Sequence, residues 1–163
     1  MALAMVPPIP ADPEPTHVPV LADEVVEVLS AAPAGTYVDL TVGLGGHAGR
    51  LLDAHPGLRL VGIDRDREAL AVAGERLARF GDRVTLVHAR SDELADVLAD
   101  RGVDDVTAIL ADLGMSSLQV DSPRRGFSYR AGGPLDMRMD QSRGRTAVEV
   151  LADLDEDTFV RAL

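Results

Sequence analysis

The segment VDLTVGLGGHAG, residues 38–49, runs from an apolar stretch into a loop that contains Gly43, Gly45 and Gly46. Loops of this kind need glycines because ligand and backbone approach closely and because tight turns require positive φ angles. Read as GxGxxA from Gly43, the loop matches the dinucleotide fingerprint of NAD enzymes. Read as DxTxGxG from Asp39, it is typical of the first motif of S-adenosylmethionine enzymes. The loop therefore predicts a nucleotide-type ligand and leaves open which one.

Asp64 is the second candidate, at the end of the apolar run LRLVGID. A carboxylate at the end of such a strand can accept hydrogen bonds from both hydroxyls of a ribose. The alternative is a helix N-cap, a role that would suit Asp64 or Asp66. Both NAD and S-adenosylmethionine contain adenosine, so a ribose contact at Asp64 does not separate them.

Asp112 separates the two ligands better. In ILADLGMSS, this carboxylate follows apolar residues and precedes a loop of small residues. In amino-group methyltransferases a polar residue at such a place accepts a hydrogen bond from the target amine and so orients the nitrogen lone pair toward the methyl carbon. Hydride chemistry more often uses a base or a hydroxyl. The alternative role for Asp112 is a structural cap of residues 115–117.

Metal and thiol chemistry are not expected. His47 lies inside the glycine loop, where it contacts the ligand or packs at the start of the next helix, and the four histidines show no metal-ligand spacing. There is no cysteine, which excludes disulfides and thiol catalysis.

The segment RRGFSYR, residues 124–130, interleaves arginines with two aromatic residues. Between Pro123 and Thr146, six arginines face two acids, a local charge of +4 in a chain whose net charge is −11. Guanidinium groups neutralise phosphates, and aromatic faces stack on unpaired bases. The alternative is a solvated loop with its aromatic side chains in the core. The RNA-binding interpretation assigns contacts to Arg124, Arg125, Phe127, Tyr129 and Arg130.

Strand-like and helix-like segments alternate along the chain, which predicts an α/β fold with a parallel sheet covered on both faces. We expect strands at 36–40, 58–64, 84–89 and 106–114, and helices at 20–31, 46–57, 65–80, 91–102 (with Ser91 as a candidate N-cap) and from Thr146 to the end of the chain. Ligands bind such sheets beyond the carboxyl ends of the strands. The glycine loop, Asp64, Ser91 and Asp112 all fall at such ends.

Length and composition fit one globular domain. The chain has 163 residues, of which 46% are hydrophobic and 26% charged. No apolar run approaches the roughly 18 residues of a membrane span, and the N-terminus lacks the basic region of a signal peptide. Residues 1–16 contain five prolines and are expected to form a disordered arm. We therefore expect a cytoplasmic protein without a membrane partner.

Taken together, the segments resemble a known family, the bacterial methyltransferases of the RsmH or MraW type, which modify the exocyclic N4 of a cytosine in 16S ribosomal RNA. The matching segments run in family order from His17 to about Leu151: HVPVLADEVVEVL, DLTVGLGGHAGRLL, GIDRDREAL, ADLGMSSLQVD, RRGFSYR and GPLDMRMD. The resemblance implies a Rossmann-like sheet that binds S-adenosylmethionine over residues 17–122, followed by the Arg-rich loop and the start of a helical insertion over 123–163.

The resemblance also implies roles for individual residues. Gly45, Gly46 and His47 would contact the methionine part of the cofactor, and Asp64 would hold its ribose. Asp112 and Gln119 would line the cofactor and the entry to the target base, with Asp112 as the catalytic residue. Ser91, also near the cofactor, stands where some members carry an aromatic residue, and a serine cannot stack on adenine.

The implied function is methyl transfer from S-adenosylmethionine to N4 of a decoding-centre cytosine in the 16S ribosomal RNA of the small ribosomal subunit, without a metal. Family members are roughly twice as long as this chain, so we expect a fragment whose sheet is incomplete at its C-terminal side. Its fourth strand would then have an open apolar edge. Two alternatives are an NAD-dependent oxidoreductase and a catalytically inactive fragment that binds cofactor or RNA.

Overall fold

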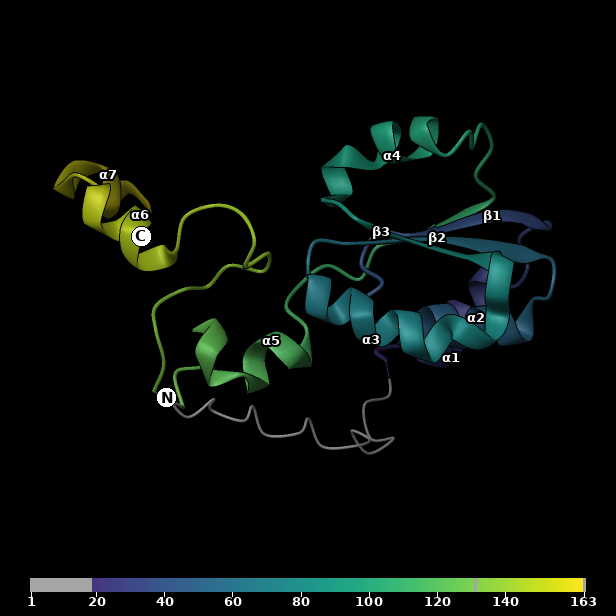
Figure 1. Cartoon of the computed structure of the whole chain (residues 1–163), viewed down its shortest axis with the longest axis horizontal. Coiled ribbons are helices and arrows are strands. Elements are labelled where there is room, and N and C mark those ends of the chain that lie inside the picture. Colours follow the sequence, from purple (N-terminus) through teal and green to yellow (C-terminus); the bar gives the residue numbers. More distant parts are fainter. Residues whose placement is uncertain (1–18, 131, 163) are drawn as a thin grey trace, which may run out of the picture.

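The structure, a computed structural model, describes residues 19–130 and 132–162 (Figure 1). The arm expected over residues 1–16 and His17 lie outside these ranges, so that expectation stays a prediction. In the described part of the chain the strands are β1 (Gly35–Asp39), β2 (Leu58–Asp64), β3 (Val84–His88) and β4 (Ala108–Leu110). The helices are α1 (Ala22–Leu29), α2 (Gly46–Ala54), α3 (Arg67–Leu77), α4 (Leu94–Asp100), α5 (Ser117–Asp121), α6 (Ala147–Asp153) and α7 (Glu156–Ala162).

The four strands form one parallel sheet in the order β3-β2-β1-β4. Tyr37 in β1 pairs with Leu60 in β2 on one side and with Ala108 in β4 on the other. The chain therefore builds outward from β1 to β3 and then returns to the opposite side of β1. This reversal lies between β1 and β4, and in open α/β sheets ligands bind at such a point. The predicted parallel sheet is confirmed.

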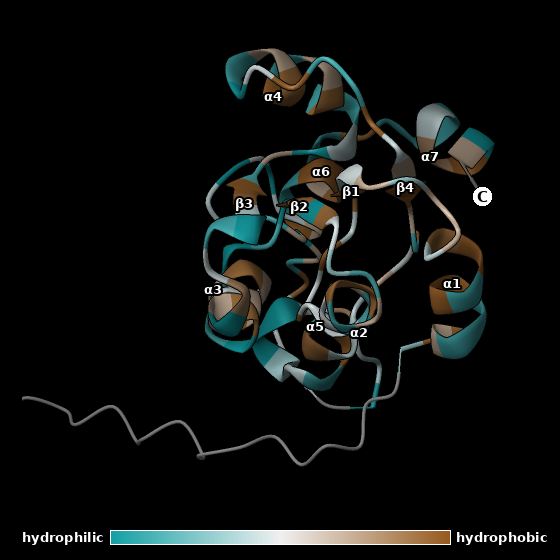
Figure 2. Cartoon of the chain, turned by 90° about the vertical axis from the view of Figure 1, so that its right-hand side faces the viewer, coloured by the Kyte–Doolittle hydropathy of each residue, from teal (hydrophilic) through white to brown (hydrophobic). Residues whose placement is uncertain are grey.

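Helices cover both faces of the sheet (Figures 1 and 2). On one face, α2 and α3 bury Leu51, Leu52 and Leu77 against Tyr37 and Leu60. On the other face, α4 packs against a second cluster that includes Val38, Val61, Ile63 and Val97. Each fully buried aliphatic side chain contributes about 1.5–3 kcal/mol by leaving water, so these two layers hold the strands in register.

The fourth strand is shorter than expected. The pattern over 106–114 predicts a long strand, whereas β4 spans Ala108–Leu110 only. After Leu110 the backbone leaves the ladder, and the Asp112 N–H donates to Thr41 Oγ1 at 2.8 Å instead. Among the described strands β4 pairs with β1 alone, and Ile109 is half exposed on it, as expected for an edge strand.

The C-terminal part also differs from expectation. The helix predicted from Thr146 onward is two helices, because Leu154 is extended between α6 and α7. The start of the helix at Thr146 agrees with the prediction, and Thr146 is its N-cap, in a capping box with Glu149. Sequence periodicity missed α5, which is too short to show it. The division into domains at residue 122 stays a prediction.

Ser91 does not cap the helix that follows it. It is the first residue of a 3₁₀ turn (Ser91–Glu93) that leads into α4. The start of this turn is capped by Glu93 instead, whose carboxylate accepts the Arg90 N–H at 2.6 Å. None of the helices in the described residues is long and apolar enough to cross a membrane.

Candidate cofactor and active site

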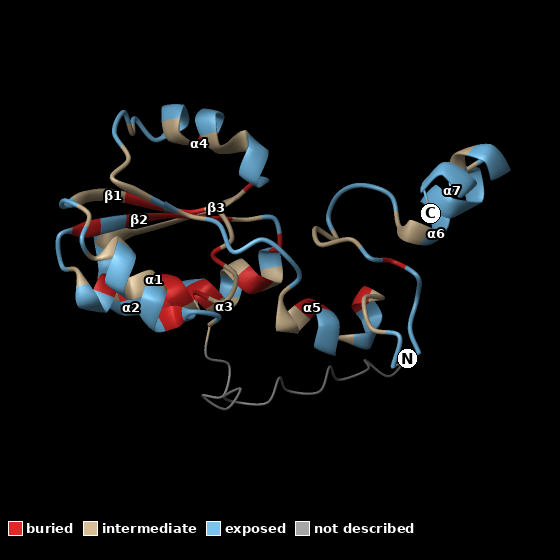
Figure 3. Ribbon diagram, turned by 180° about the vertical axis from the view of Figure 1, so that it is seen from behind, coloured by how far each residue is buried: buried red, intermediate tan, exposed pale blue. Residues whose placement is uncertain are grey.

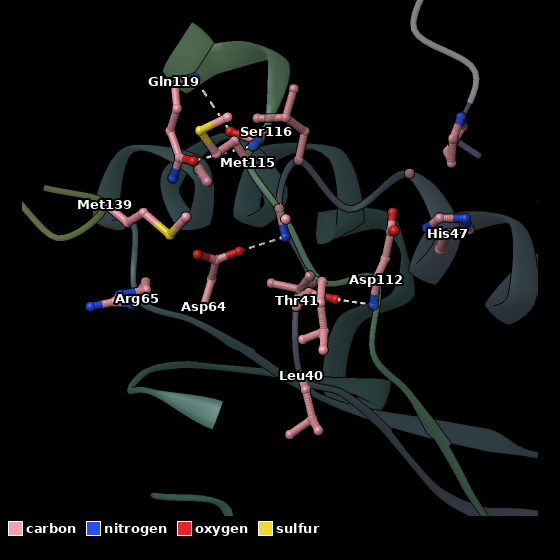
Figure 4. A pocket seen from close by; sticks show the side chains of 18 of the residues that line it. Leu40, Thr41, His47, Asp64, Arg65, Asp112, Met115, Ser116, Gln119 and Met139 are labelled. Carbon is pink, nitrogen blue, oxygen red and sulfur yellow. Dashed lines mark hydrogen bonds between the residues drawn. The ribbon is translucent and has the colours of Figure 1, made fainter. Parts of the chain in front are cut away.

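A cavity of about 460 Å³ opens at the carboxyl ends of the strands (Figure 4). Ligand sites for small molecules typically have volumes of about 300–1,000 Å³. The cavity is lined by most of the residues predicted for the cofactor: Gly46, His47, Asp64, Ser91, Asp112 and Gln119. Segments far apart in the sequence thus meet at one place, as the order of strands and helices predicts.

The glycine loop between β1 and α2 needs its glycines for two different reasons. Gly43 and Gly45 have φ angles of 51° and 80°, in the left-handed region. Gly46 has no such angle, but a Cβ there would lie 2.6 Å from Pro19 Cγ. Gly45 does not line the cavity: a Cβ on it would lie 3.2 Å from Leu77, so the structure gives it a role in packing α2 against α3.

Asp64 faces the glycine loop from the end of β2. Its Oδ2 accepts the Gly43 N–H at 2.8 Å, and its Oδ1 accepts the Asp66 N–H at 2.9 Å. Burial raises the pKa of Asp64, against the effect of these hydrogen bonds. Each carboxylate oxygen keeps a second lone pair for another donor. Asp66, not Asp64, is the N-cap of α3, because its Oδ1 accepts the Glu68 N–H at 3.0 Å. The carboxylate of Asp64 therefore remains able to bind a diol.

Asp112 lies in the loop after β4, on the other side of the cavity from Asp64 (Figure 4). Its side chain is exposed, and its carboxylate makes no hydrogen bond to another described residue. Its backbone is held by Thr41, whose Oγ1 accepts the Asp112 N–H at 2.8 Å. The loop thus has a fixed backbone and a carboxylate free to meet a substrate.

Behind Thr41 is a buried carboxylate to which sequence reasoning gave no role beyond its place in the motif. The Tyr37 hydroxyl donates to Asp39 Oδ2 at 3.0 Å, and the Thr41 N–H donates to Asp39 Oδ1 at 3.1 Å. Burial raises the pKa of Asp39 to about 6, although hydrogen bonds from Thr41 and Tyr37 lower it. Burial and the nearby Asp39 raise the pKa of Tyr37 as well. Asp39 and Thr41 therefore connect the sheet interior to the loop that carries Asp112.

His47 lies on the cavity wall, and its imidazole ring already makes a hydrogen bond within the protein. Its Nε2 is 2.8 Å from the carbonyl oxygen of Val20. Because a carbonyl oxygen can only accept, Nε2 carries the proton in this contact. His47 is 8% exposed, so it ties the segment before α1 to the glycine loop and presents only a small surface to a ligand.

Both polar atoms of the Gln119 side-chain amide make hydrogen bonds. Its Oε1 accepts the Ser116 N–H at 3.2 Å, and its Nε2 donates to Asp66 Oδ2 at 3.1 Å. The Ser116-x-x-Gln119 capping box starts α5 and was visible in the sequence as a helix signal. Gln119 lines the cavity as a fixed part of its wall.

The residues predicted to bind RNA divide into two groups. Arg124, Tyr129 and Arg130 are exposed, and Phe127 is half-buried. Arg125 is 1% exposed, and its guanidinium donates to Asp66 and to the Met139 carbonyl. A buried and paired guanidinium offers little surface to a phosphate, so the structure does not favour Arg125 as an RNA contact, and the contacts assigned to residues 124–130 stay a prediction. Among the described residues, no group of three or more His, Asp or Glu could hold a metal ion.

Comparisons with known proteins agree with the sequence resemblance. A family model described as the MraW methylase family matches residues 14–163. A relative from Nocardia farcinica named ribosomal RNA small subunit methyltransferase H is 52% identical over 153 residues, covering 90% of this chain and 47% of the relative. A relative of the same name from Salinispora tropica is 56% identical over 154 residues, covering 90% and 42%.

The chain thus spans about half the length of the curated relatives it matches. Among solved structures, an rRNA methylase from Streptococcus thermophilus has a TM-score of 0.44 at 24% identity, covering 57% of this chain and 52% of that chain. That likeness is too low to add to the family match.

Proposed function

The chain belongs to the MraW methylase family, and from this premise we propose that it carries the cofactor site and part of the RNA-binding surface of a methyltransferase that acts on 16S ribosomal RNA. The observation that carries the proposal is the meeting of the glycine loop, Asp64 and Asp112 around one cavity at the point where the sheet reverses. The shared name of the two relatives supports small-subunit ribosomal RNA as the substrate, and that substrate implies a cytoplasmic location.

S-adenosylmethionine is the cofactor of this family, and the residues of the cavity fit it. Asp64 offers a carboxylate with spare lone pairs for the ribose hydroxyls, and Gly43 and Gly46 present backbone without side chains to the cavity. When bound, the cofactor supplies a methyl group on a sulfonium sulfur. Membership of a methylase family speaks against the NAD alternative, which rests only on the glycine spacing and on Asp64.

We propose that the target is N4 of a cytosine, unpaired or flipped out of its stack. The Asp112 carboxylate would accept a hydrogen bond from N4–H and orient the nitrogen lone pair. It would take up the N4 proton when the methyl group passes to N4 and its bond to the sulfonium sulfur breaks, which leaves a neutral thioether. Thr41 keeps the Asp112 backbone in place through the 2.8 Å hydrogen bond. Most of the acceleration then comes from positioning and from a carboxylate directed at developing positive charge.

The RNA-binding part of the proposal rests on exposed residues of the segment 124–130. Tyr129 is 92% exposed, and the Arg130 guanidinium lies 5.9 Å from its ring centroid. An exposed ring with an arginine beside it suits an unpaired base and its phosphate. Arg124 and Phe127 complete the surface, and Arg125 is no longer part of it.

The first experiment is a calorimetric titration of the chain with S-adenosylmethionine and, separately, with NAD. We expect binding of S-adenosylmethionine only, lost in Asp64→Ala and unchanged in Asp104→Ala, a control at an exposed loop position. Binding of NAD only would overturn the proposal.

The second experiment tests turnover and target. The chain and the full-length Salinispora tropica relative are each incubated with S-adenosylmethionine and immature small subunits, and the RNA is digested to nucleosides for mass spectrometry. N4-methylcytidine from the relative supports the target. If the chain binds cofactor but methylates nothing, it is the inactive binding fragment; methylation of another atom by the relative contradicts the N4 assignment.

A further inference from the structure

A polar cluster around the buried Arg125 joins the Arg-rich segment to the cofactor cavity. We call it the Arg125 cluster: the side chains of Arg125, Asp66, Glu68 and Gln119 with the carbonyl group of Met139. Arg125 Nη2 lies 2.5 Å from Asp66 Oδ2 and 2.7 Å from the Met139 oxygen, and Nη1 lies 3.2 Å from Glu68 Oε2. Gln119 Nε2 donates to the same Asp66 oxygen at 3.1 Å. The guanidinium thus connects the start of α3 directly to the segment that contains Met139, and through Asp66 it is linked to the helix α5.

Stability alone does not account for this arrangement. A buried ion pair often contributes no more than an apolar replacement of the same shape, because both charges lose their hydration. Arg125 Nε is in addition buried without a hydrogen-bond partner among the described residues, which is unfavourable. The arrangement therefore suggests that Arg125 is held here for the position that it imposes on its partners.

Those partners belong to the cavity. Gln119 and Met139 both line it, and the Asp66 N–H donates to Asp64 Oδ1, the carboxylate proposed for the ribose. A displacement of Asp66 would therefore affect both Asp64 and the part of the cavity wall formed by Gln119 and Met139.

The backbone around Arg125 is fitted just as closely. The Met137 N–H donates to the Arg125 carbonyl at 2.9 Å. A Cβ on Gly126 would lie 2.3 Å from the Pro134 oxygen, and one on Gly133 would lie 2.1 Å from the Pro123 oxygen. The backbone around Arg125 and the backbone leading to Met139 are thus packed against each other, and a displacement of the Arg125 guanidinium would displace both.

We propose that Arg125 is a positioning residue of the cofactor site: by binding Asp66 and the Met139 carbonyl, it holds Met139 and Gln119 as the cavity wall beside the ribose-binding Asp64. The inference rests on the proposed function, because it takes the cofactor to bind with its ribose at Asp64. It gives this arginine of the RRGFSYR segment a role in cofactor binding and leaves RNA contact to its exposed neighbours.

The test compares S-adenosylmethionine binding by calorimetry in the wild-type chain and in Arg125→Met, Arg125→Lys and Arg145→Met. Arg145 is a matched control, an exposed arginine whose partners Glu149 and Asp153 lie on α6. We expect the Kd to rise about tenfold in Arg125→Met, since small misplacements around a site can cost up to about 100-fold. Arg125→Lys should fall in between, and Arg145→Met should stay within about twofold of the wild type. All titrations are made at a temperature at which circular dichroism shows each variant folded.

A second measurement distinguishes positioning from a general effect on folding. Hydrogen exchange of peptides covering residues 134–140 is followed with and without S-adenosylmethionine. Binding should protect these amides in the wild type and in Arg145→Met. In Arg125→Met the protection should be smaller, even at a cofactor concentration that saturates the site.

The outcomes are distinguishable. If the wild type binds and Arg125→Met binds equally well with the same protection, the inference is overturned and the proposed function stands. If the wild type binds no S-adenosylmethionine, the proposed function and the inference fail together. Should Arg125→Met not fold, Arg125→Lys decides: wild-type affinity and protection in that variant would also overturn the inference.

Discussion

Two regions of this molecule are held in place in different ways. The sheet region, residues 35–110, buries aliphatic side chains on both faces of four strands. The docked segment, residues 112–146, has three buried positions among its described residues, Gln119, Arg125 and Asp136, and all three are polar or charged. In Figure 3 the buried positions of the first region gather on β1, β2, α2 and α3, whereas those of the second region lie singly along the chain.

The difference matters because the cavity has one wall from each region. Aliphatic burial is non-directional and tolerates local variation as long as volume and pattern are kept. Hydrogen-bonded ion pairs require particular atoms at particular distances. We therefore expect changes in the sheet region to act on the whole fold and changes in the docked segment to act on the cavity.

The largest effect is expected in the sheet interior. Leu60 lies on β2, the strand between β1 and β3, and is 1% exposed. Leu60→Ala should therefore lower the free energy of unfolding by about 2–5 kcal/mol, through lost burial and a residual cavity. Ile109→Ala, at a half-exposed position of the edge strand β4, should cost clearly less. Urea unfolding followed by circular dichroism measures both, and equal losses would contradict the assigned interior and edge.

A smaller and more local effect is expected in the docked segment. Gly126 has φ 74°, and a Cβ there would lie 2.3 Å from the Pro134 oxygen. Gly126→Ala should therefore destabilise this segment by about 2–3 kcal/mol, from the left-handed angle and the backbone contact together. Faster hydrogen exchange confined to residues 123–139 would show it.

Gly144→Ala is the matched control for that change. Gly144 has φ 77° and open space around its Cα, so alanine there meets the same conformational penalty of about 1–2 kcal/mol without the contact. If the two variants exchange alike, the close approach of the two chain stretches is not what holds the segment.

The same contrast explains which parts could be predicted from sequence. The bounds of β2 were predicted to the residue and those of β1 and β3 to within one, because buried parallel strands are continuous apolar runs between turn signals. Most residues that line the cavity could be predicted from these strand positions, since the carboxyl ends of parallel strands meet at one edge of the sheet. The end of β4 was mispredicted because an interaction distant in sequence, Asp112 N–H with Thr41, ends the ladder.

The burial of Arg125 was out of reach for a similar reason. Two adjacent arginines, Arg124 and Arg125, have the same local signature, yet one is exposed and the other buried. What separates them is the position of Asp66, which only the folded arrangement supplies. A charge count therefore predicts an Arg-rich surface but cannot say which arginine belongs to it.

A pH effect is expected from the buried Asp39 of the sheet region. Burial raises its pKa from 3.8 to about 6. Because the folded-state pKa lies above the unfolded value, Asp39 contributes stability that is fully present below about pH 4 and is lost as the pH rises through about 6. The free energy of unfolding of the wild type minus that of Asp39→Asn should thus fall by about 2 kcal/mol from pH 4 to pH 7.

Tyr37→Phe sharpens that measurement. The Tyr37 hydroxyl donates to Asp39 and lowers its pKa, so its removal should move the midpoint of the pH-dependent loss upward. Urea unfolding at a series of pH values follows both variants. A difference between wild type and Asp39→Asn that is independent of pH would mean that Asp39 titrates normally.

The smallest effect is expected where the two regions meet, at Thr41. Thr41→Val keeps the shape of the side chain but removes the acceptor of the Asp112 N–H. Losing one such hydrogen bond should lower the free energy of local opening of this loop by about 1 kcal/mol. Global stability should hardly change, while the Asp112 amide exchanges several-fold faster in hydrogen-exchange NMR. Thr41→Ser, which keeps the hydroxyl, should retain the wild-type rate. Fast exchange in both variants would mean that packing by the Thr41 methyl group, and not its hydroxyl, holds the loop; wild-type exchange in both would mean that the Asp112 backbone is fixed by the rest of the loop.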